Sequence, residues 1–199
     1  MKQKVMNHIK NNWQEYASFI SMIVLIVLGL IYAFNLNNFD FNYPLAYYGG
    51  DDMGGLQDAK LFAEQGWMLS TDRMGAPYSS DIYDFSSSLL HNFGLMIMKL
   101  CVLITGNYIV GFNIYYLSIF VLAGIVSYIV MRQLKINNWV TAAMSAVYGL
   151  SPYMIARGVG HMVLVEAYFI PLSFLLCFWV MEREDVFQFN KNFFKTPAN

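Results

Sequence analysis

Charged residues are scarce in this sequence. Only 13% of its 199 residues are Asp, Glu, Lys or Arg, against about 25% in an average soluble domain. The formal net charge is -1, so the chain has no excess of Lys and Arg of the kind that binds nucleic acid. Hydrophobic residues make up 57% of the chain. This balance predicts an integral membrane protein with no nucleic-acid partner.

Cysteine and metal-ligand patterns are scarce as well. The two cysteines, Cys101 and Cys177, both lie inside apolar stretches. They do not form a disulfide framework, and no Cys/His spacing of the zinc-binding kind occurs. The glycine pairs on either side of residues 51–53 lack the spacing of a phosphate-binding loop. Disulfide scaffolds, zinc sites and nucleotide-binding loops are therefore not expected.

Long uncharged stretches are what the sequence does contain. Tyr16 to Phe39 carries no charge, and about 20 apolar residues in a helix cross the ~30 Å hydrocarbon core of a bilayer. The exit from this stretch, NLNNFDFNYP, has no small-residue cleavage site, so we expect a permanent span and not a cleaved signal peptide. The same reasoning along the chain predicts four transmembrane helices, at about 16–36, 107–131, 138–156 and 162–181.

The positive residues orient these spans. Lysines concentrate near the N-terminus, which places it in the cytoplasm by the positive-inside rule. Arg132 and Lys135 reach the same side only if Leu89–Gly106 does not cross the membrane. The polar interruptions of that segment favour a helix lying flat in the outer interface. We therefore expect a protein of the cytoplasmic (inner) membrane with a large outer loop.

The predicted fold class is all-α, a polytopic membrane protein with about four transmembrane helices and amphipathic interfacial helices in its first outer loop. We expect the chain to be the N-terminal part of a longer protein, a truncated reading frame, or a fragment that needs a partner. The predicted regions are a cytoplasmic N-terminus at 1–15, a first span at 16–36, an outer loop at 37–106, a three-helix membrane segment at 107–181, and a truncated cytoplasmic tail at 182–199.

An amphipathic helix is predicted inside the outer loop. In GLQDAKLFAEQGW, the residues Leu56, Ala59, Ala63 and Trp67 recur at helical spacing with polar residues between them. Gly66 is a suitable residue to end such a helix. The loop therefore has an ordered core of its own.

Two adjacent carboxylates, Asp51 and Asp52, precede this helix in YYGGDDMGG. One interpretation is a solvated turn, since Asp and Gly are common turn residues. The other is a catalytic pair that acts as a general base or binds a divalent cation, because paired carboxylates raise one pKa or hold a hard cation. Asp58, on the amphipathic helix, shares that site or only solvates the helix.

A second polar cluster lies in SPYMIARGVGHMVLVE. Arg157 and His161 flank a short turn, and Glu166 falls at the start of the fourth predicted span. An ionisable residue at membrane depth usually marks a functional interior or a paired partner. These three residues are candidate substrate-binding groups. The alternative is that they are an interfacial anchor, a helix start and an ion-pair partner of Lys99 or Arg157.

In order and spacing these features resemble the GT-C superfamily, the polytopic glycosyltransferases that use polyprenyl-phosphate-linked sugars. The resemblance covers about 16–181 and lies in an early outer-loop acid, membrane-hugging helices, and the segments NIYYLSIFVLAGIVSYIVMRQL, TAAMSAVYGLSPYMIAR and GHMVLVEAYFIPLSF. GAPYSSDIYDF and PYMIARGVGHMVLVEAYFIPL are similar to bacterial envelope members. Members of the superfamily usually have many more spans than the four predicted in this chain.

The resemblance implies a function and site roles. A sugar would move from a polyprenyl-phosphate donor to an envelope glycan or glycolipid at the outer face, with membrane lipid around the site. Asp51 or Asp52 would match the first-loop acid, and Arg157 the second-loop arginine. The acids that follow this arginine in the oligosaccharyltransferase branch are missing here, so a divalent cation and a metal-free general base both stay open. The alternatives are a transporter or flippase subunit, and a non-catalytic assembly subunit with a larger membrane partner.

Overall fold

Helices make up most of the chain that the computed structural model describes, which is residues 12–45, 51–65, 70–73, 77–81, 89–157, 161 and 165–182. The expected all-α class is confirmed; among these residues the only strands are a two-residue pair, β1 (Ser70–Thr71) and β2 (Ser80–Asp81). The helices are α2 (Trp13–Ala33), η1 (Leu36–Asn38), α3 (Asp51–Gln65), α4 (Leu89–Thr105), α5 (Tyr108–Gln133), α6 (Asn138–Gly149), α7 (Pro152–Arg157), η3 (Ala167–Phe169) and α9 (Ile170–Glu182).

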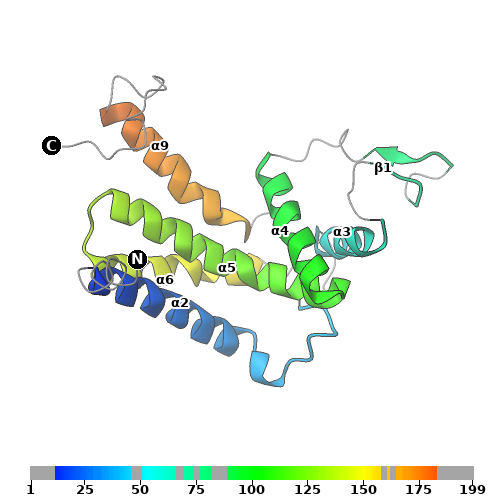
Figure 1. Ribbon diagram of the computed structural model, residues 1–199, viewed down its shortest axis with the longest axis horizontal. Helices are drawn as coiled ribbons and strands as arrows, with labels where there is room; N and C mark the ends of the chain where they lie inside the picture. The colour runs from blue at the N-terminus through cyan, green and yellow to red at the C-terminus, as the bar shows by residue number, and fades with distance from the viewer. Residues whose placement is uncertain are drawn as a thin grey trace, which may run out of the picture.

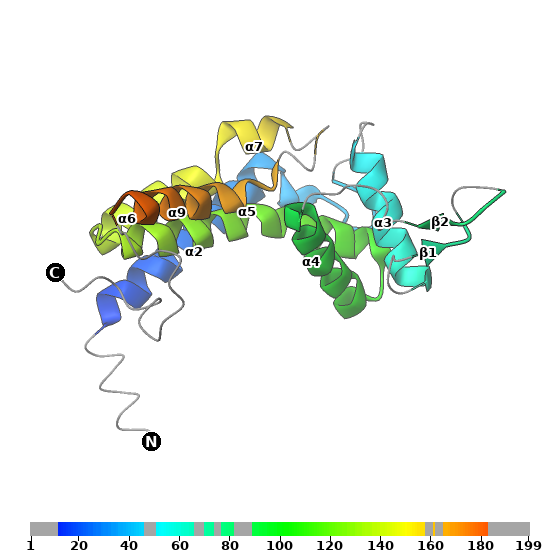
Figure 2. The same ribbon diagram turned by 90° about the horizontal axis from the view of Figure 1, so that it is seen from above.

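Four helices, α2, α5, α6 and α9, run roughly side by side and alternate in direction (Figures 1 and 2). α5 is central, since α2, α6 and α9 all pack against it, and α2 also packs against α6. At one end of this bundle α2 ends and α5 begins, and α3, α4 and α7 lie there too; we call it the α3 end. At the opposite end residues 134–137 join α5 to α6, and we call it the 134–137 end.

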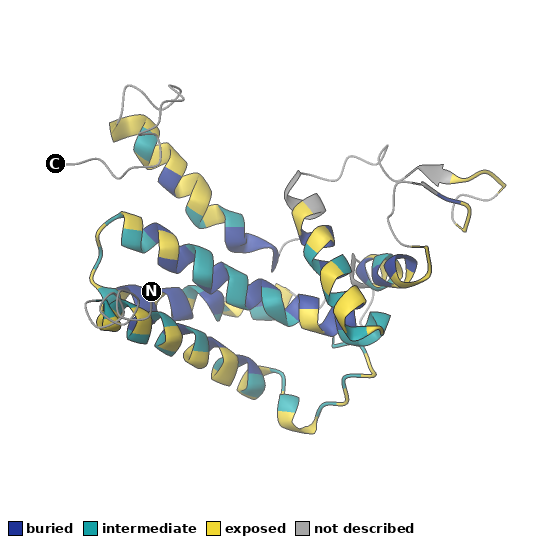
Figure 3. Cartoon of the chain, in the orientation of Figure 1, coloured by how far each residue is buried: buried dark blue, intermediate teal, exposed yellow. Residues whose placement is uncertain are grey.

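α2 has one narrow buried stripe and a broad exposed apolar surface. The stripe is Ser18, Met22, Ile26 and Leu30, one residue per helical turn. The rest of the helix exposes large apolar side chains, and Figure 3 shows this outer face; they include Ile20, Val24, Leu25, Val27 and Leu28. Exposure of so large an apolar face to water is unfavourable, whereas its contact with lipid chains is not.

In the part of the chain that the structure describes, two helices are long and apolar enough to cross a membrane, α2 and α5. They match the expected first and second spans to within a few residues. α6 has 12 residues and α9 has 13. At 1.5 Å per residue each covers only about 20 Å, less than the ~30 Å hydrocarbon core. Four crossings therefore stay a prediction, while two helices of spanning length are found.

The span expected at 138–156 is not one continuous helix. α6 ends at Gly149, and a separate short helix, α7, begins at Pro152 and leaves the line of α6 (Figure 2). The physical reason is Pro152, which has no backbone N–H to continue the ladder and clashes with the preceding turn. The expected span at 162–181 is also interrupted near its start, where the short η3 precedes α9.

Glycines let α5 approach its neighbours closely. A Cβ at Gly149 of α6 would lie 2.9 Å from the carbonyl oxygen of Phe120 on α5, closer than real Cβ atoms come. A Cβ at Gly124 of α5 would overlap the side chain of Ile26 on α2. Small residues at such positions are common where helices pack in membranes, because they bring the two backbones together.

α4 and α5 form a helical hairpin with a very short connection. Gly106 takes a left-handed conformation, with φ of 64°, and its N–H donates to the carbonyl of Val102 at 2.9 Å. The next residue, Asn107, caps α5: its side chain accepts from Ile109 N at 2.9 Å and from Val110 N at 3.3 Å. The expected helix at 89–106 is confirmed, and its flat placement in the interface stays a prediction.

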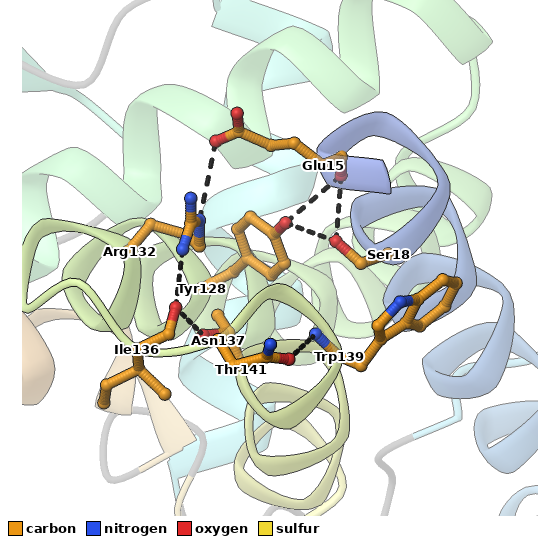
Figure 4. Close-up of polar contacts among 8 residues, drawn as sticks. All are labelled: Glu15, Ser18, Tyr128, Arg132, Ile136, Asn137, Trp139 and Thr141. Carbon is orange, nitrogen blue, oxygen red and sulfur yellow. Dashed lines mark hydrogen bonds and ion pairs between the residues drawn. The ribbon is translucent and has the colours of Figure 1, made fainter. Parts of the chain in front are cut away.

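A polar network fastens the 134–137 end (Figure 4). Arg132 Nε of α5 lies 3.5 Å from Glu15 Oε1 of α2, and Arg132 Nη1 donates to the carbonyl of Ile136 at 2.5 Å. The hydroxyl of Tyr128 contacts that of Ser18 at 2.7 Å and donates to the carbonyl of Glu15 at 3.2 Å. The first turn of α2 is thereby tied to the last turns of α5.

Candidate functional site

The predicted catalytic pair lies in the first turn of α3. Asp51 and Asp52 are the first two residues of this helix, and Gly54 and Gly55 continue it. The backbone at these two residues is therefore helical and does not form the solvated turn of the first interpretation. Acidic residues in a first turn are stabilised by the positive end of the helix dipole. The side chains of the two aspartates lie outside the described atoms, so their roles stay predictions.

α3 buries one face against α4 and α5. Ala59 is buried, as expected from the apolar spacing, but Ala63 is exposed, contrary to expectation; Leu61 and Phe62, which lie outside that spacing, are buried. The helix ends at Gln65, one residue before the predicted stop. Lys99 of α4 holds its ammonium group 5.7 Å from the ring centroid of Phe62, a cation–π distance.

Asp58 lies on the same helix as the predicted catalytic pair. Its side chain is half-buried and engaged in a polar or electrostatic interaction, so it is not a purely solvated charge. Trp67, the last residue of the predicted apolar face, lies outside the described residues. The predicted amphipathic helix is thus confirmed, with its apolar face shifted by one position at residues 62 and 63.

Asn113 of α5 positions the chain that leads into α3. Its fully buried side chain accepts from Leu45 N at 2.8 Å, and its amide group donates to the carbonyls of Phe41 at 3.0 Å and Tyr43 at 2.8 Å. Three backbone groups of the segment after α2 are thus satisfied by one side chain. Sequence reasoning missed this residue; the signal was an amide side chain inside an otherwise apolar span.

Arg157 and His161 lie next to each other, and α7, which ends at Arg157, lies at the α3 end (Figure 2). Arg157 is the last residue of α7, and both side chains are exposed. The backbone N–H of His161 donates to the carbonyl of Arg157 at 3.0 Å. Within the described residues, no hydrogen bond or ion pair engages the Arg157 guanidinium. A free guanidinium at this position can bind phosphate oxygens in a fork.

Glu166 is buried, not on the surface with the other candidates. It is 8% exposed, and its carboxylate accepts a hydrogen bond from the hydroxyl of Tyr115, a fully buried residue of α5. The prediction considered Lys99 or Arg157 as its partner; the hydrogen bond shows that a neutral phenol is one of its partners. Gly94 of α4 covers this pair: a Cβ there would overlap both the Glu166 carboxylate and the Tyr115 hydroxyl.

The residues after Glu166 are held by a second tyrosine and by aromatic packing. The hydroxyl of Tyr148, on α6, donates to the carbonyl of Ala167 at 2.7 Å. The ring of Tyr168 packs against Phe93 of α4, with centroids 6.0 Å apart, and against Phe169 at 4.7 Å. Three helices, α4, α5 and α6, therefore contact the short stretch 166–169. Sequence reasoning did not identify these tyrosines as partners of this stretch.

No metal centre is visible in the part of the chain that the structure describes. There, no three His, Cys, Asp or Glu side chains come close enough together to hold a metal ion. The side chains of Asp51 and Asp52 are not among the atoms that the structure describes. A divalent cation at the predicted pair therefore stays an open alternative.

Residues 55–193 match a family described as a domain of unknown function (DUF6311). This match covers more than half of the chain, and the protein belongs to that family. Neither the curated proteins nor the solved structures give a match to the chain. The family begins within α3 and includes α4 to α9, so it contains the second polar cluster and most of the helix that carries the first.

Proposed function

We propose that this protein is a membrane glycosyltransferase, or the N-terminal part of one, that moves a sugar from a polyprenyl-phosphate carrier to an envelope glycan or glycolipid. The observation that carries the proposal is the placement of the two polar clusters. The first turn of α3, with Asp51 and Asp52, and the end of α7, with Arg157, both lie at the α3 end of the bundle. The Glu15–Arg132 ion pair lies at the opposite end.

The two clusters have complementary chemistry for this reaction. One aspartate accepts the proton of an acceptor hydroxyl, and the resulting oxygen attacks the anomeric carbon of the sugar. The bond from that carbon to the phosphate oxygen breaks, and polyprenyl phosphate leaves with the bonding electron pair. The guanidinium of Arg157, assisted by His161, stabilises the charge on the departing phosphate. The proton on the aspartate is then lost to water.

The apolar surface supports a lipid-linked substrate. α9 exposes large side chains along most of its length, and α2 does so on its outer face (Figure 3); those of α9 include Ile170, Leu172, Phe174, Leu176 and Val180. In a bilayer, these surfaces would be covered by lipid chains beside the α3 end. A polyprenyl chain in the bilayer would place its phosphate at the membrane surface, at the depth where helix ends and interfacial helices lie.

The test is substitution of each aspartate in the full-length protein in its own host. Asp51→Asn and Asp52→Asn remove the base and keep the size of the side chain, so at least one should abolish modification of the envelope glycan, measured by mass spectrometry. Asp72→Asn, an exposed aspartate near β1, is the matched control. Immunoblots of the membrane fraction establish equal protein. Normal modification in both variants, with full expression, contradicts the proposal.

A transporter or flippase subunit is the alternative. Transport would require charged groups along a path through the membrane, accessible from both sides. Glu166 is the candidate for such a group, but it is buried under Gly94 and hydrogen-bonded to Tyr115. This environment favours a structural role for the carboxylate over a role on a transport path. Labelling of Glu166→Cys by a charged thiol reagent from both sides of the membrane would reverse that preference.

A further inference from the structure

Glu166 and Tyr115 join a segment that follows α7 to the centre of the bundle. Glu166 lies five residues after His161, and Tyr115 lies in the first half of α5; the pair is 51 residues apart in sequence. Both side chains are buried, so the hydrogen bond between them is shielded from water. In a low-dielectric interior a hydrogen bond to a carboxylate is stronger than one between neutral groups.

Neighbouring contacts restrict the positions that Glu166 and Tyr115 can take. Gly94 of α4 lies so close to both oxygens that no side chain fits there. The hydroxyl of Tyr148 holds the next carbonyl, that of Ala167. On the other side of His161, α7 is anchored by Met154, which is 1% exposed. Residues on both sides of Arg157 and His161, Met154 before them and Glu166 after them, are thus buried in the core.

We propose that Glu166 and Tyr115 are positioning residues, a latch that fixes the distance between His161 and α3. α3 packs on α4 and α5, and Gly94 and Tyr115 belong to those two helices. Because Glu166 is held by the same two helices as α3, the latch fixes the position of one polar cluster relative to the other. Neither residue needs to touch a substrate. The consequence for catalysis rests on the proposed function, whereas the latch itself does not.

The test measures a distance in the full chain. Cys101 and Cys177 are first replaced by Ser, and spin labels are attached at Ala63→Cys on α3 and at His161→Cys, both exposed positions. Pulsed electron resonance then gives the distribution of distances between the labels. Tyr115→Phe removes only the hydroxyl, and Glu166→Ala removes the acceptor. Each should convert a single narrow distribution into a broad one.

The size of the effect follows from the bond that is lost. A buried hydrogen bond to a carboxylate should shift the ratio of open to closed latch by roughly tenfold or more, equivalent to about 1.4 kcal/mol. Glu166→Gln keeps an acceptor oxygen for Tyr115, so it should keep the narrow distribution. Tyr128→Phe is the matched control, since it removes a buried hydroxyl from the same helix at the 134–137 end.

The outcomes separate the latch from the catalytic proposal. Unchanged distances in Tyr115→Phe and Glu166→Ala overturn the latch, as does equal broadening in Tyr128→Phe or in Glu166→Gln. If Glu166→Ala does not fold, Tyr115→Phe, which loses a single oxygen atom, decides the matter. Asp51→Asn and Asp52→Asn variants with normal glycan modification would remove the transferase proposal and leave the distance result unaffected.

Discussion

Asn113 binds the backbone of Leu45, 68 residues earlier in the chain, through a 2.8 Å hydrogen bond from Leu45 N to Asn113 Oδ1. The same side chain also donates to two further carbonyls of that segment. The path from α2 toward α3 is therefore set by a residue inside α5. This arrangement connects the placement of the predicted catalytic pair to the core of the bundle.

Replacing Asn113 should loosen this connection. Asn113→Ala leaves one partly buried N–H and two carbonyls without their side-chain partner, so we expect a loss of about 1–3 kcal/mol in the free energy of unfolding. Hydrogen exchange at the Leu45 amide should speed up as well. Asn42→Ala, which removes an exposed amide bonded to Asp40, is the control and should change stability little. Equal thermal midpoints for the two variants would contradict this expectation.

The ion pair at the opposite end should contribute much less. Glu15 and Arg132 keep 46% and 28% of their side-chain surface exposed, so water screens their attraction. A double-mutant cycle with Glu15→Gln and Arg132→Gln should give a coupling energy of about 0.2–1 kcal/mol that falls as salt rises. A coupling that does not change with salt would argue against this screened geometry.

Two glycine-to-alanine substitutions should have opposite effects. Gly149→Ala places a methyl group against the backbone of Phe120, so α5 and α6 must separate, and we expect a loss of stability. Gly54→Ala faces open space within α3 and should stabilise the protein by about 0.5–1 kcal/mol through helix propensity. Thermal unfolding of the purified variants in detergent measures both. A Gly149→Ala protein as stable as the parent would show that the helices repack freely.

The two ends of the bundle should lie on opposite sides of the membrane. Lys135→Cys is at the 134–137 end and Asn38→Cys is just after α2. In a background without the native cysteines, a charged maleimide added to intact cells should label residue 38, and residue 135 only after the cells are opened. Labelling of both positions in intact cells would contradict the predicted orientation.

The two native thiols should differ in reactivity. Burial raises the pKa of the Cys101 thiol, so the thiolate fraction at a given pH falls in the folded protein. Because the thiolate is the nucleophile, alkylation of Cys101 in a Cys177→Ser variant should be slower than in the unfolded chain at neutral pH and should approach it only at higher pH. A pH–rate profile measured before and after unfolding tests this. Identical profiles would show that the thiol is not shielded.

The sequence alone predicted much of the helical framework. Uncharged stretches located α2 and α5 to within a few residues, and helical spacing located α3 and α4, because hydrophobic pattern and helix formation have the same physical origin. The stretch 138–156 was placed as one span, although it is divided into α6 and α7, because the residues on both sides of the break are apolar. The buried face of α3 was misplaced at Ala63 because three apolar residues in a row, 61–63, leave the period ambiguous.

The contacts that place the candidate site could not be read from the sequence. Asn113 with Leu45 and Tyr115 with Glu166 join residues 68 and 51 positions apart. No local periodicity reports such pairs, because they depend on which helices become neighbours. Glu166 was identified as an unusual charge near a membrane span, but the phenol that meets it was one of several tyrosines in an aromatic helix.

The turn at Gly106 and Asn107 has a mechanical consequence. Only these two residues separate α4 from α5, and both are held by hydrogen bonds to the adjoining helices. This hydrogen-bonded turn therefore fixes the angle between α4 and α5. If α5 crosses the bilayer, its tilt determines the depth and the tilt of α4. Because α3 packs on these two helices, the distance of α3 from the membrane surface then also depends on the tilt of α5. A change in bilayer thickness that alters the tilt of α5 would then shift the start of α3, with its two aspartates, relative to the membrane surface.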